Sequence, residues 1–299
     1  MRKEIHSYCF SDEAIHGWKR VLNGEEAQRV VRSLSYERDG RSIGCFERYR
    51  LESAFQPIFR RGERGLVLQG HEALLRPMLD GVSLPVHTFL NAVDRDQGFF
   101  LERLLRVLHV RNFCLLADGT QKLFLNINPE VFTDVLRSER CVDTFMQRLE
   151  SHGIEPRRLV FEIIETMHDD KVILAQVVEQ FRSHGVAIAI DDFGAQHSNF
   201  DRVFDLHPDL VKFDLQWLSR CRGDMRAVRF LTGMVELIKE LDVEVSCEGI
   251  ETEQELRIAL DAGFDLFQGY FLGRPSPALV QGTIDYPHVD AHVRARVSV

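Results

Sequence analysis

The chain has 299 residues, 44% of them hydrophobic and 28% charged, which is usual for a globular protein with one large domain or two small ones. Its net charge of −9 argues against a broad nucleic-acid-binding surface, so DNA and RNA polymers are not expected partners. The sequence has no apolar run long enough to span a membrane, no apolar signal core and no Cys-x-x-Cys pair. We therefore expect a cytoplasmic protein with reduced cysteines, without a zinc site or a disulfide framework.

Residues 1–50 differ from the rest and are predicted to form a short helical lead-in. Apolar residues recur at helical spacing within 15–34, and Asn23-Gly24 separates two short helices. The polar stretch Ser35–Arg50 is interpreted as a connector. Fifty residues are few for a sensor domain, so we expect this segment to pack on the main domain, residues 51–299, or on a protein partner.

The main domain is predicted to begin with two strands, Phe55–Phe59 and Leu66–Leu75. The turn Arg61–Gly65 between them is short, and a short turn joins antiparallel strands. A helical region follows from Val86 to Leu116, with a predicted break near Gln97-Gly98.

After this region, predicted strands and helices alternate. The strands are 123–125, 159–161, 186–193, 210–211, 243–247 and 265–267, and the helices are 141–151, 172–183, 225–241 and 252–262. Alternating units imply parallel strands with right-handed crossovers. About eight strands over roughly 250 residues predict an irregular (β/α)8 barrel of the TIM type with an antiparallel first strand. An open doubly wound sheet is the alternative fold.

The predicted strand Val186–Phe193 begins with five apolar residues, which are followed directly by two adjacent carboxylates, Asp191 and Asp192. Like charges packed side by side repel one another unless a positive charge lies between them. Because hard cations prefer carboxylate oxygens, a pair of divalent ions is the natural occupant. A solvated turn closed by Gly194 is the alternative interpretation.

Other predicted strands also end in polar or charged residues. The full set is Glu72, Asn126, Glu162, Asp191, Asp192, Lys212, Glu248 and Gln268. In a (β/α)8 barrel, chemistry takes place at the carboxyl ends of the strands, so these residues are expected to meet at one site. Oxygen ligands without His or Cys favour Mg²⁺ or Mn²⁺, and we expect two such ions.

A series of short motifs lies at the predicted strand ends. The motif Glu72-Ala73-Leu74 is followed by Arg76. The other motifs, in chain order, are Gln56-Pro57-Ile58, Asn126-Ile127-Asn128, Glu162-x-x-Glu165, Asp191-Asp192-Phe193-Gly194, Lys212-Phe213-Asp214, Glu248-Gly249-Ile250-Glu251-Thr252 and Gln268-Gly269-Tyr270. In residues and in order, these motifs resemble those of the EAL domain, the cyclic-di-GMP phosphodiesterase domain, whose name comes from the motif at Glu72-Ala73-Leu74. The resemblance covers about Phe55 to Pro277.

The resemblance implies hydrolysis of cyclic-di-GMP to the linear dinucleotide pGpG by a two-metal mechanism. The metal ligands that it implies are Glu72, Asn126, Glu162 and Asp191 for the first ion, and Asp191, Asp192 and Glu248 for the second. The catalytic residues that it implies are Glu72, Lys212, Glu248 and Glu165. The substrate-binding residues are Gln56, Arg76, Gln268 and Asp214, with Arg76 pairing with a phosphate. A homodimer is also implied, and Ca²⁺ is expected to bind while supporting little turnover.

The loop Phe193–Phe200 departs from the family pattern, since Ala195, Gln196, His197 and Asn199 replace Thr, Gly, Tyr and Ser. If the Gly needs a positive φ, Gln196 adds strain of about 1 kcal/mol or changes the path of the loop. A catalytically weak or inactive cyclic-di-GMP receptor that signals through protein contacts is therefore the alternative function. An unrelated Mg²⁺-dependent lyase of the enolase type, with Lys212 as its base, is a third. No Gly-Gly-Asp-Glu-Phe segment occurs, so no diguanylate-cyclase domain is expected in this sequence.

Overall fold

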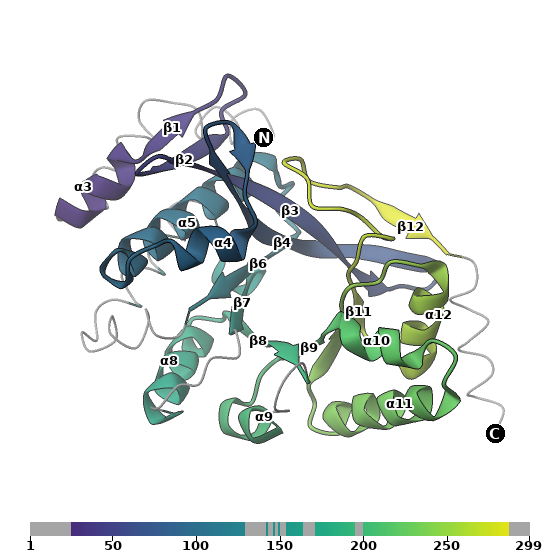
Figure 1. The fold of residues 1–299 in the computed structure, drawn as a ribbon. Helices are drawn as coiled ribbons and strands as arrows, with labels where there is room; N and C mark the ends of the chain where they lie inside the picture. The colour runs from purple at the N-terminus through teal and green to yellow at the C-terminus, as the bar shows by residue number, and fades with distance from the viewer. Residues whose placement is uncertain are drawn as a thin grey trace.

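The computed structural model describes residues 25–128, 154–163, 171–194 and 200–286, together with Val142, Met146 and Leu149. Its barrel strands are β3 (Tyr49–Arg61), β4 (Gly65–Leu79), β6 (Lys122–Ile127), β7 (Leu159–Ile163), β8 (Ala187–Phe193), β9 (Leu210–Phe213), β10 (Glu244–Cys247) and β11 (Leu266–Phe267). Each strand pairs with the next, and β11 returns to pair with β3, so the sheet is closed (Figure 1). The first strand, β3, is antiparallel to both neighbours, and the strands from β4 to β11 run parallel. The irregular (β/α)8 barrel predicted from the sequence is confirmed.

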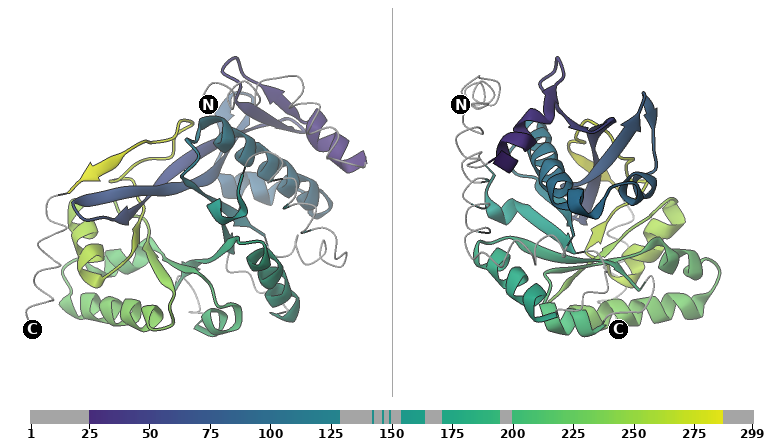
Figure 2. Two further views of the ribbon diagram at one scale, coloured as in Figure 1. Left: turned by 180° about the vertical axis from the view of Figure 1, so that it is seen from behind. Right: turned by 60° about the vertical axis from the view of Figure 1, so that its left-hand side comes forward.

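Helices cover the outer side of these strands (Figure 2). They are α4 (Val86–Asn91), α5 (Arg95–Leu116), the 3₁₀ turn η1 (Pro156–Arg158), α8 (Lys171–Ser183), α9 (Phe200–Leu206), α10 (Leu215–Cys221), α11 (Met225–Lys239) and α12 (Glu253–Ala262). In α11 the buried side chains Leu231, Val235 and Ile238 recur at helical spacing, as the sequence predicted. None of the helices in the described ranges combines the length and the hydrophobicity needed to cross a membrane.

The predicted helix break near Gln97-Gly98 is wrong in position. The chain leaves the helical path between Asn91 and Arg95, and Gly98 lies inside α5. A Cβ atom on Gly98 would meet nothing within 4 Å, so this glycine does not mark a constraint on the backbone. Of the predicted helix 141–151, the structure describes Val142, Met146 and Leu149, which are helical and buried.

The interpretation of Ser35–Arg50 as a connector is also wrong. After helix α3 (Glu25–Arg32), the strands β1 (Leu34–Tyr36) and β2 (Ser42–Phe46) form, and they pair in the order β1–β2–β3. One face of this small sheet is buried on α5, where Asn112 exchanges two hydrogen bonds with the backbone of Ser42. The other face carries the polar residues, which is why the stretch looked like a connector. The predicted boundary at residue 50 falls inside β3.

Two short strands complete the sheet. Strand β5 (Val82–Ser83) continues the hairpin after β4, and β12 (Thr283–Asp285) pairs with the first residues of β4. Between β11 and β12 the chain forms a bridge from Ser276 to Phe55. The segment after β11 therefore contacts both strands of the β3–β4 hairpin.

The centre of the barrel is filled by an apolar layer. It consists of Ile58, Phe124, Val160, Ala189, Leu210 and Leu266, which contact one another although they come from six different strands. Side chains that meet from so many strands of a closed sheet lie in its lumen. The apolar layer therefore fixes which face of each strand points inward.

Candidate functional site

A layer of polar side chains lies next to the apolar layer, closer to the carboxyl ends of the parallel strands. Its members are Glu72, Asn126, Glu162, Asp191, Lys212, Glu248 and Gln268. Most of them stand two positions after a residue of the apolar layer, as Glu162 follows Val160 and Lys212 follows Leu210. Because strand side chains alternate between faces, a step of two keeps the side chain inside the lumen.

Lys212 is the centre of the polar layer. Its side chain is 1% exposed, and its Nζ lies 2.6 Å from Oε1 of Glu162 and 2.6 Å from Oε1 of Glu248. The same nitrogen lies 3.4 Å from Oδ1 of Asp191 and 3.9 Å from Oε2 of Glu72. Four strand ends thus direct carboxylates toward one ammonium group. The convergence predicted from the sequence is present for these residues.

Burial and mutual repulsion shift the pKa values of this cluster. Burial raises the pKa of Glu162 well above its usual range, against the pull of Lys212. Burial also raises the pKa of Glu248 to about 8, and the charge of Lys212 again opposes the shift. For Lys212 itself, burial alone would lower the pKa, but the surrounding carboxylates hold it well above its usual range. The surrounding carboxylates therefore favour the charged ammonium form of Lys212.

Two amide side chains fix the carboxylate of Glu72. Asn126 donates from Nδ2 to Oε1 over 2.9 Å, and Gln268 donates from Nε2 to Oε2 over 2.6 Å. Each oxygen thus has one donor from a different strand end. This arrangement sets the plane of the carboxylate and leaves the side-chain oxygens of Asn126 and Gln268 for other partners.

The donor types of the polar layer fit a divalent cation. They are carboxylate and amide oxygens, the ligands that Mg²⁺ and Mn²⁺ prefer. Glu162 is fully buried, and its Oε2 has no hydrogen-bond partner among the described residues, which leaves a buried carboxyl oxygen to be satisfied. In the described part of the chain, however, no three acidic, His or Cys side chains stand close enough together to hold a metal as they are. The carboxylates are instead drawn around the ammonium of Lys212.

Asp191 and Asp192 point in different directions. Asp191 reaches Lys212, whereas Asp192 is exposed and has a φ of 53°, at an irregularity in the pairing of β8 with β9. The backbone N–H of Asp192 donates to Oδ1 of Asp191 over 3.0 Å. The predicted role of Asp192 as a second-metal ligand stays a prediction.

Gly194, which follows this strand, is held against Trp217. Its φ is 84°, and a Cβ atom there would lie 2.5 Å from Nε1 of Trp217. The same indole nitrogen donates to the carbonyl of Phe193 over 3.2 Å. The backbone therefore needs glycine here, and the path out of β8 is fixed at Gly194. The divergent residues Ala195–Asn199 lie outside the described residues, as does Glu165.

The loop after Glu248 is held by the buried carboxylate of Glu255, which was not among the predicted site residues. Glu255 is fully buried and accepts hydrogen bonds from the backbone N–H groups of Glu251 and Thr252, each over 2.9 Å. It also pairs with Arg222, whose Nε lies 2.9 Å away. Thr252 and Glu255 form a capping box at the start of α12, and the spacing Thr-x-x-Glu is the sequence signal that could have revealed it.

Three predicted substrate-binding residues lie outside the polar cluster. Gln56, which is paired across the hairpin with Glu72, donates to the carbonyl of Gly273 over 3.2 Å. Arg76 is half-buried farther along β4, on the same face as Glu72. Asp214 accepts a hydrogen bond from the N–H of Gln216 and caps α10. A cap accounts for Asp214 without a substrate, so its binding role stays a prediction.

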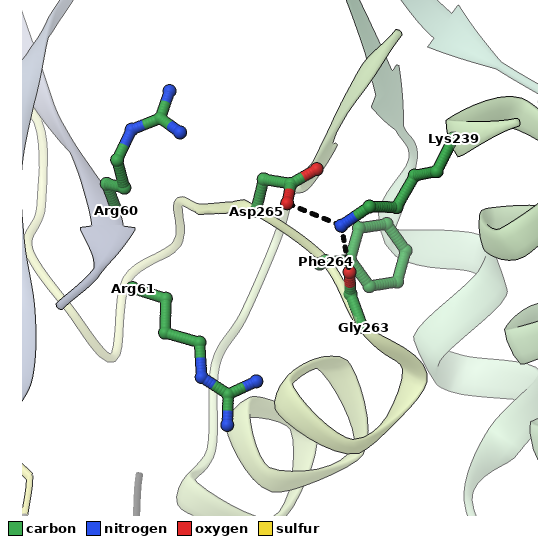
Figure 3. Close-up of a pocket in the computed structure, with 6 residues that line it drawn as sticks. All are labelled: Arg60, Arg61, Lys239, Gly263, Phe264 and Asp265. Atoms are coloured by element: carbon green, nitrogen blue, oxygen red, sulfur yellow. Dashed lines mark hydrogen bonds and ion pairs between the residues drawn. The ribbon is translucent and has the colours of Figure 1, made fainter. Parts of the chain in front are cut away.

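A cavity of about 360 Å³ lies at the opposite end of the barrel (Figure 3). Its lining residues are Arg60, Arg61, Lys239, Gly263, Phe264 and Asp265. Lys239 donates to Oδ1 of Asp265 over 2.5 Å and to the carbonyl of Gly263 over 3.0 Å. Arg60 forms a bidentate pair with Glu244. Lys239 and Arg60 thus already pair with carboxylates. We therefore interpret the cavity as a structural feature of this end of the barrel.

Among known protein families, the family model described as "EAL domain" matches residues 41–275 of this chain. MucR of Pseudomonas aeruginosa, named as a bifunctional diguanylate cyclase/cyclic di-GMP phosphodiesterase, is 32% identical over 285 residues, which are 91% of this chain and 38% of MucR. RocR of the same species, named as a cyclic di-GMP phosphodiesterase, is 26% identical, over 83% of this chain and 61% of RocR. The chain spans between about two fifths and about three fifths of the lengths of these relatives.

Solved structures give the same result. The Bacillus subtilis YkuI protein, crystallised with substrate c-di-GMP and calcium, matches with a TM-score of 0.70 and 25% identity, over 83% of this chain and 61% of YkuI. A standalone EAL protein from Vibrio cholerae, in its c-di-GMP-bound form, matches with a TM-score of 0.66 and 25% identity, over 78% of this chain and 95% of that one. With the barrel, the polar layer and the family match in agreement, the chain belongs to the EAL-domain family.

Proposed function

We propose that this protein hydrolyses cyclic-di-GMP to pGpG with the help of two divalent cations. The observation that carries the proposal is the polar layer, in which four carboxylates and two amides from separate strand ends surround one buried lysine. The names of the relatives MucR and RocR support the substrate and the reaction. Mg²⁺ or Mn²⁺ is the proposed metal, and the YkuI structure, which was crystallised with calcium, supports the use of a divalent ion.

The proposed roles are those that the resemblance to the EAL-domain family implies. Glu72, Asn126, Glu162 and Asp191 hold one cation, and Asp191, Asp192 and Glu248 hold the other. Bound cations of this kind lower the pKa of a water molecule and stabilise charge on the phosphate. Glu72 is the first ligand to consider, because Asn126 and Gln268 set the plane of its carboxylate. Glu165 is proposed to brace the loop after Asp192.

Lys212 and Arg76 are proposed to act on the substrate itself. The ammonium of Lys212 is a buried positive charge, and such a charge stabilises the negative charge that grows on the phosphate during attack by water. The guanidinium of Arg76 has a fork of donors that suits a phosphate, and Arg76 lies on the inward face of β4, beyond Glu72. Gln56, Gln268 and Asp214 complete the proposed substrate-binding set.

The test is incubation of the purified chain with cyclic-di-GMP and Mg²⁺, followed by chromatographic analysis of the products. We expect pGpG to form, and we expect a chelator to abolish its formation until Mg²⁺ or Mn²⁺ is restored. Ca²⁺ should support binding, measured by calorimetry, with little turnover. Full activity in metal-free buffer would contradict the two-metal proposal. Tight binding without product under Mg²⁺ and Mn²⁺ would instead favour the receptor alternative.

A homodimer is proposed as the assembled form, in the cytoplasm. Its support is a set of exposed aromatic side chains beside the carboxyl end of β8. Phe204 of α9 is 57% exposed, and Phe230 of α11, which stacks on Trp217, is 59% exposed. Burial of such rings is a usual stabilising contribution to association. Light scattering at tens of micromolar protein should give twice the chain mass, and the mass of a single chain would contradict the proposal.

A protein partner for residues 1–50 is also proposed.

A further inference from the structure

The β3–β4 hairpin extends past the barrel mouth and carries one continuous inward face. On β3 the residues at even positions face inward, from Ile58 in the apolar layer through Gln56 to Glu52 and Arg50. The residues between them, such as Leu51, are buried against the helices instead. Arg50 and Glu52 therefore lie on the same face as the polar layer, beyond it on the solvent side.

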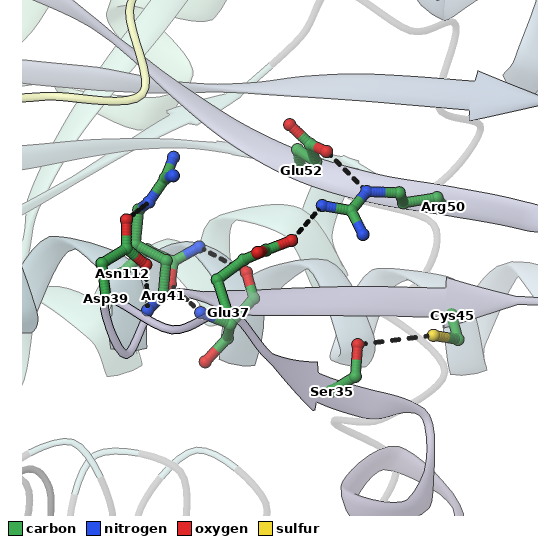
Figure 4. Close-up of polar contacts among 9 residues, drawn as sticks. Ser35, Glu37, Asp39, Arg41, Cys45, Arg50, Glu52 and Asn112 are labelled. Atoms are coloured by element: carbon green, nitrogen blue, oxygen red, sulfur yellow. Dashed lines mark hydrogen bonds and ion pairs between the residues drawn. The ribbon is translucent and has the colours of Figure 1, made fainter. Parts of the chain in front are cut away.

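An ion network occupies this extension (Figure 4). Arg50 donates from Nε to Oε1 of Glu52 over 2.6 Å, and its Nη2 donates to Oε1 of Glu37. Glu37 follows directly after β1, in the sheet that the N-terminal part of the chain adds to β3. Arg50 thus joins the carboxylate of Glu52 to the N-terminal sheet.

Glu52 has a second cation within reach. Arg76 of β4 is its direct cross-strand partner in the antiparallel register. Partners of this kind have Cβ atoms about 5 Å apart and point to the same face, so opposite charges there attract. In the structure, however, Arg50 takes the carboxylate of Glu52, and Nη1 of Arg76 donates to the carbonyl of Leu75 over 3.0 Å.

We propose that Arg50 is a positioning residue that holds Glu52 away from Arg76, so that the guanidinium of Arg76 stays available for a substrate phosphate. The inference rests on the proposed function, because it takes Arg76 to be the phosphate partner. When Arg50 is lost or drawn away, Glu52 turns to Arg76 and competes with the phosphate. Substrate affinity then falls while the polar layer remains intact.

The test measures the dissociation constant of cyclic-di-GMP by calorimetry in Ca²⁺ buffer, and kcat in Mg²⁺ buffer. Arg50→Ala should raise the dissociation constant about five-fold, the scale of a partly exposed ion pair, and leave kcat within about two-fold. Glu52→Gln alone should not weaken binding. The double variant R50A/E52Q should regain the affinity of the wild type, because the competing carboxylate is gone. Arg48→Ala is the matched control, since Arg48 precedes β3 and pairs with Asp80 over 2.9 Å, and this variant should bind as the wild type does.

The outcomes separate this inference from the function it rests on. Weakened binding in R50A that E52Q rescues supports the inference. Unchanged affinity in R50A, or a double variant as weak as R50A, overturns it while leaving the phosphodiesterase proposal in place. If the wild-type chain binds no cyclic-di-GMP, the proposed function fails and the inference fails with it. Thermal unfolding of each variant identifies a loss of affinity that comes from misfolding, which E52Q would not reverse.

Discussion

Replacing Lys212 with methionine is expected to lower kcat for cyclic-di-GMP hydrolysis by about 100- to 1000-fold, the range for loss of one preorganised charge at a reacting centre. Methionine keeps most of the volume of the side chain and removes the charge. Without the ammonium, Glu162 and Glu248 lose a partner 2.6 Å away inside the barrel. Breaking such a buried pair destabilises a protein by about 3–5 kcal/mol, so the free energy of unfolding in metal-free buffer should also fall. Steady-state kinetics and urea unfolding measure the two effects.

Lys239→Met is the matched control for this experiment. Lys239 also pairs with a carboxylate, that of Asp265, but its side chain is 39% exposed and lies at the opposite end of the barrel. Its loss should cost at most about 1 kcal/mol and leave kcat unchanged. Adding Glu248→Gln to Lys212→Met should recover part of the stability, because one uncompensated carboxylate is removed, without recovering activity. A Lys212→Met variant with normal kcat would show that the lysine has only a structural role.

Replacing Glu72 with alanine is expected to abolish hydrolysis, with a residual rate at least about 100-fold below that of the wild type. The carboxylate is a proposed ligand of the first cation, and Asn126 and Gln268 hold it in one plane. Its removal leaves two buried amide donors without an acceptor, so we expect a moderate loss of about 1–3 kcal/mol in the free energy of unfolding. Product formation and urea unfolding check the two expectations separately.

Glu72→Gln separates charge from hydrogen bonding at this position. The amide oxygen of glutamine can still accept one of the two hydrogen bonds, so this variant should be more stable than Glu72→Ala while remaining inactive. Retained hydrolysis in either variant would remove Glu72 from the catalytic set. An unfolded Glu72→Gln variant would show that the residue serves the fold first.

Much of the site followed from the sequence because parallel strands deliver their carboxyl ends to one place. Once the strands ending at Glu162, Asp191 and Lys212 were recognised, the barrel required their side chains to meet, and they do. The same reasoning could not place Asp214. A polar residue that ends one strand also begins the next helix, and Asp214 caps α10 in the structure.

The predictions that proved wrong concern features that residue patterns do not encode. The N-terminal sheet is buried on one face only, and its exposed face carries Glu37, Arg50 and Glu52, so its composition is that of a connector. The positive φ of Asp192 could not be predicted either, because it depends on how β8 and β9 pair. Glycine often ends a helix, so the sequence predicts a break at Gly98, yet the break lies between Asn91 and Arg95.

The antiparallel seam between β3 and β11 has a consequence for the order in which the molecule is built. Phe59 pairs with Phe267, and more than two thirds of the chain lies between them. On the ribosome, β3 can pair with β2 and β4 early, but the part of its edge that pairs with β11 stays open until β11 has been made. Closing so long a loop has an entropic cost, and this cost slows the pairing of β3 with β11. An open strand edge can meanwhile pair with a wrong partner. Gln268, which follows β11, supplies one of the two hydrogen bonds to Glu72, so the carboxylate reaches its final geometry only when the seam closes. In refolding experiments, recovery of catalysis should therefore report the last step of barrel assembly and lag behind the recovery of helical circular dichroism.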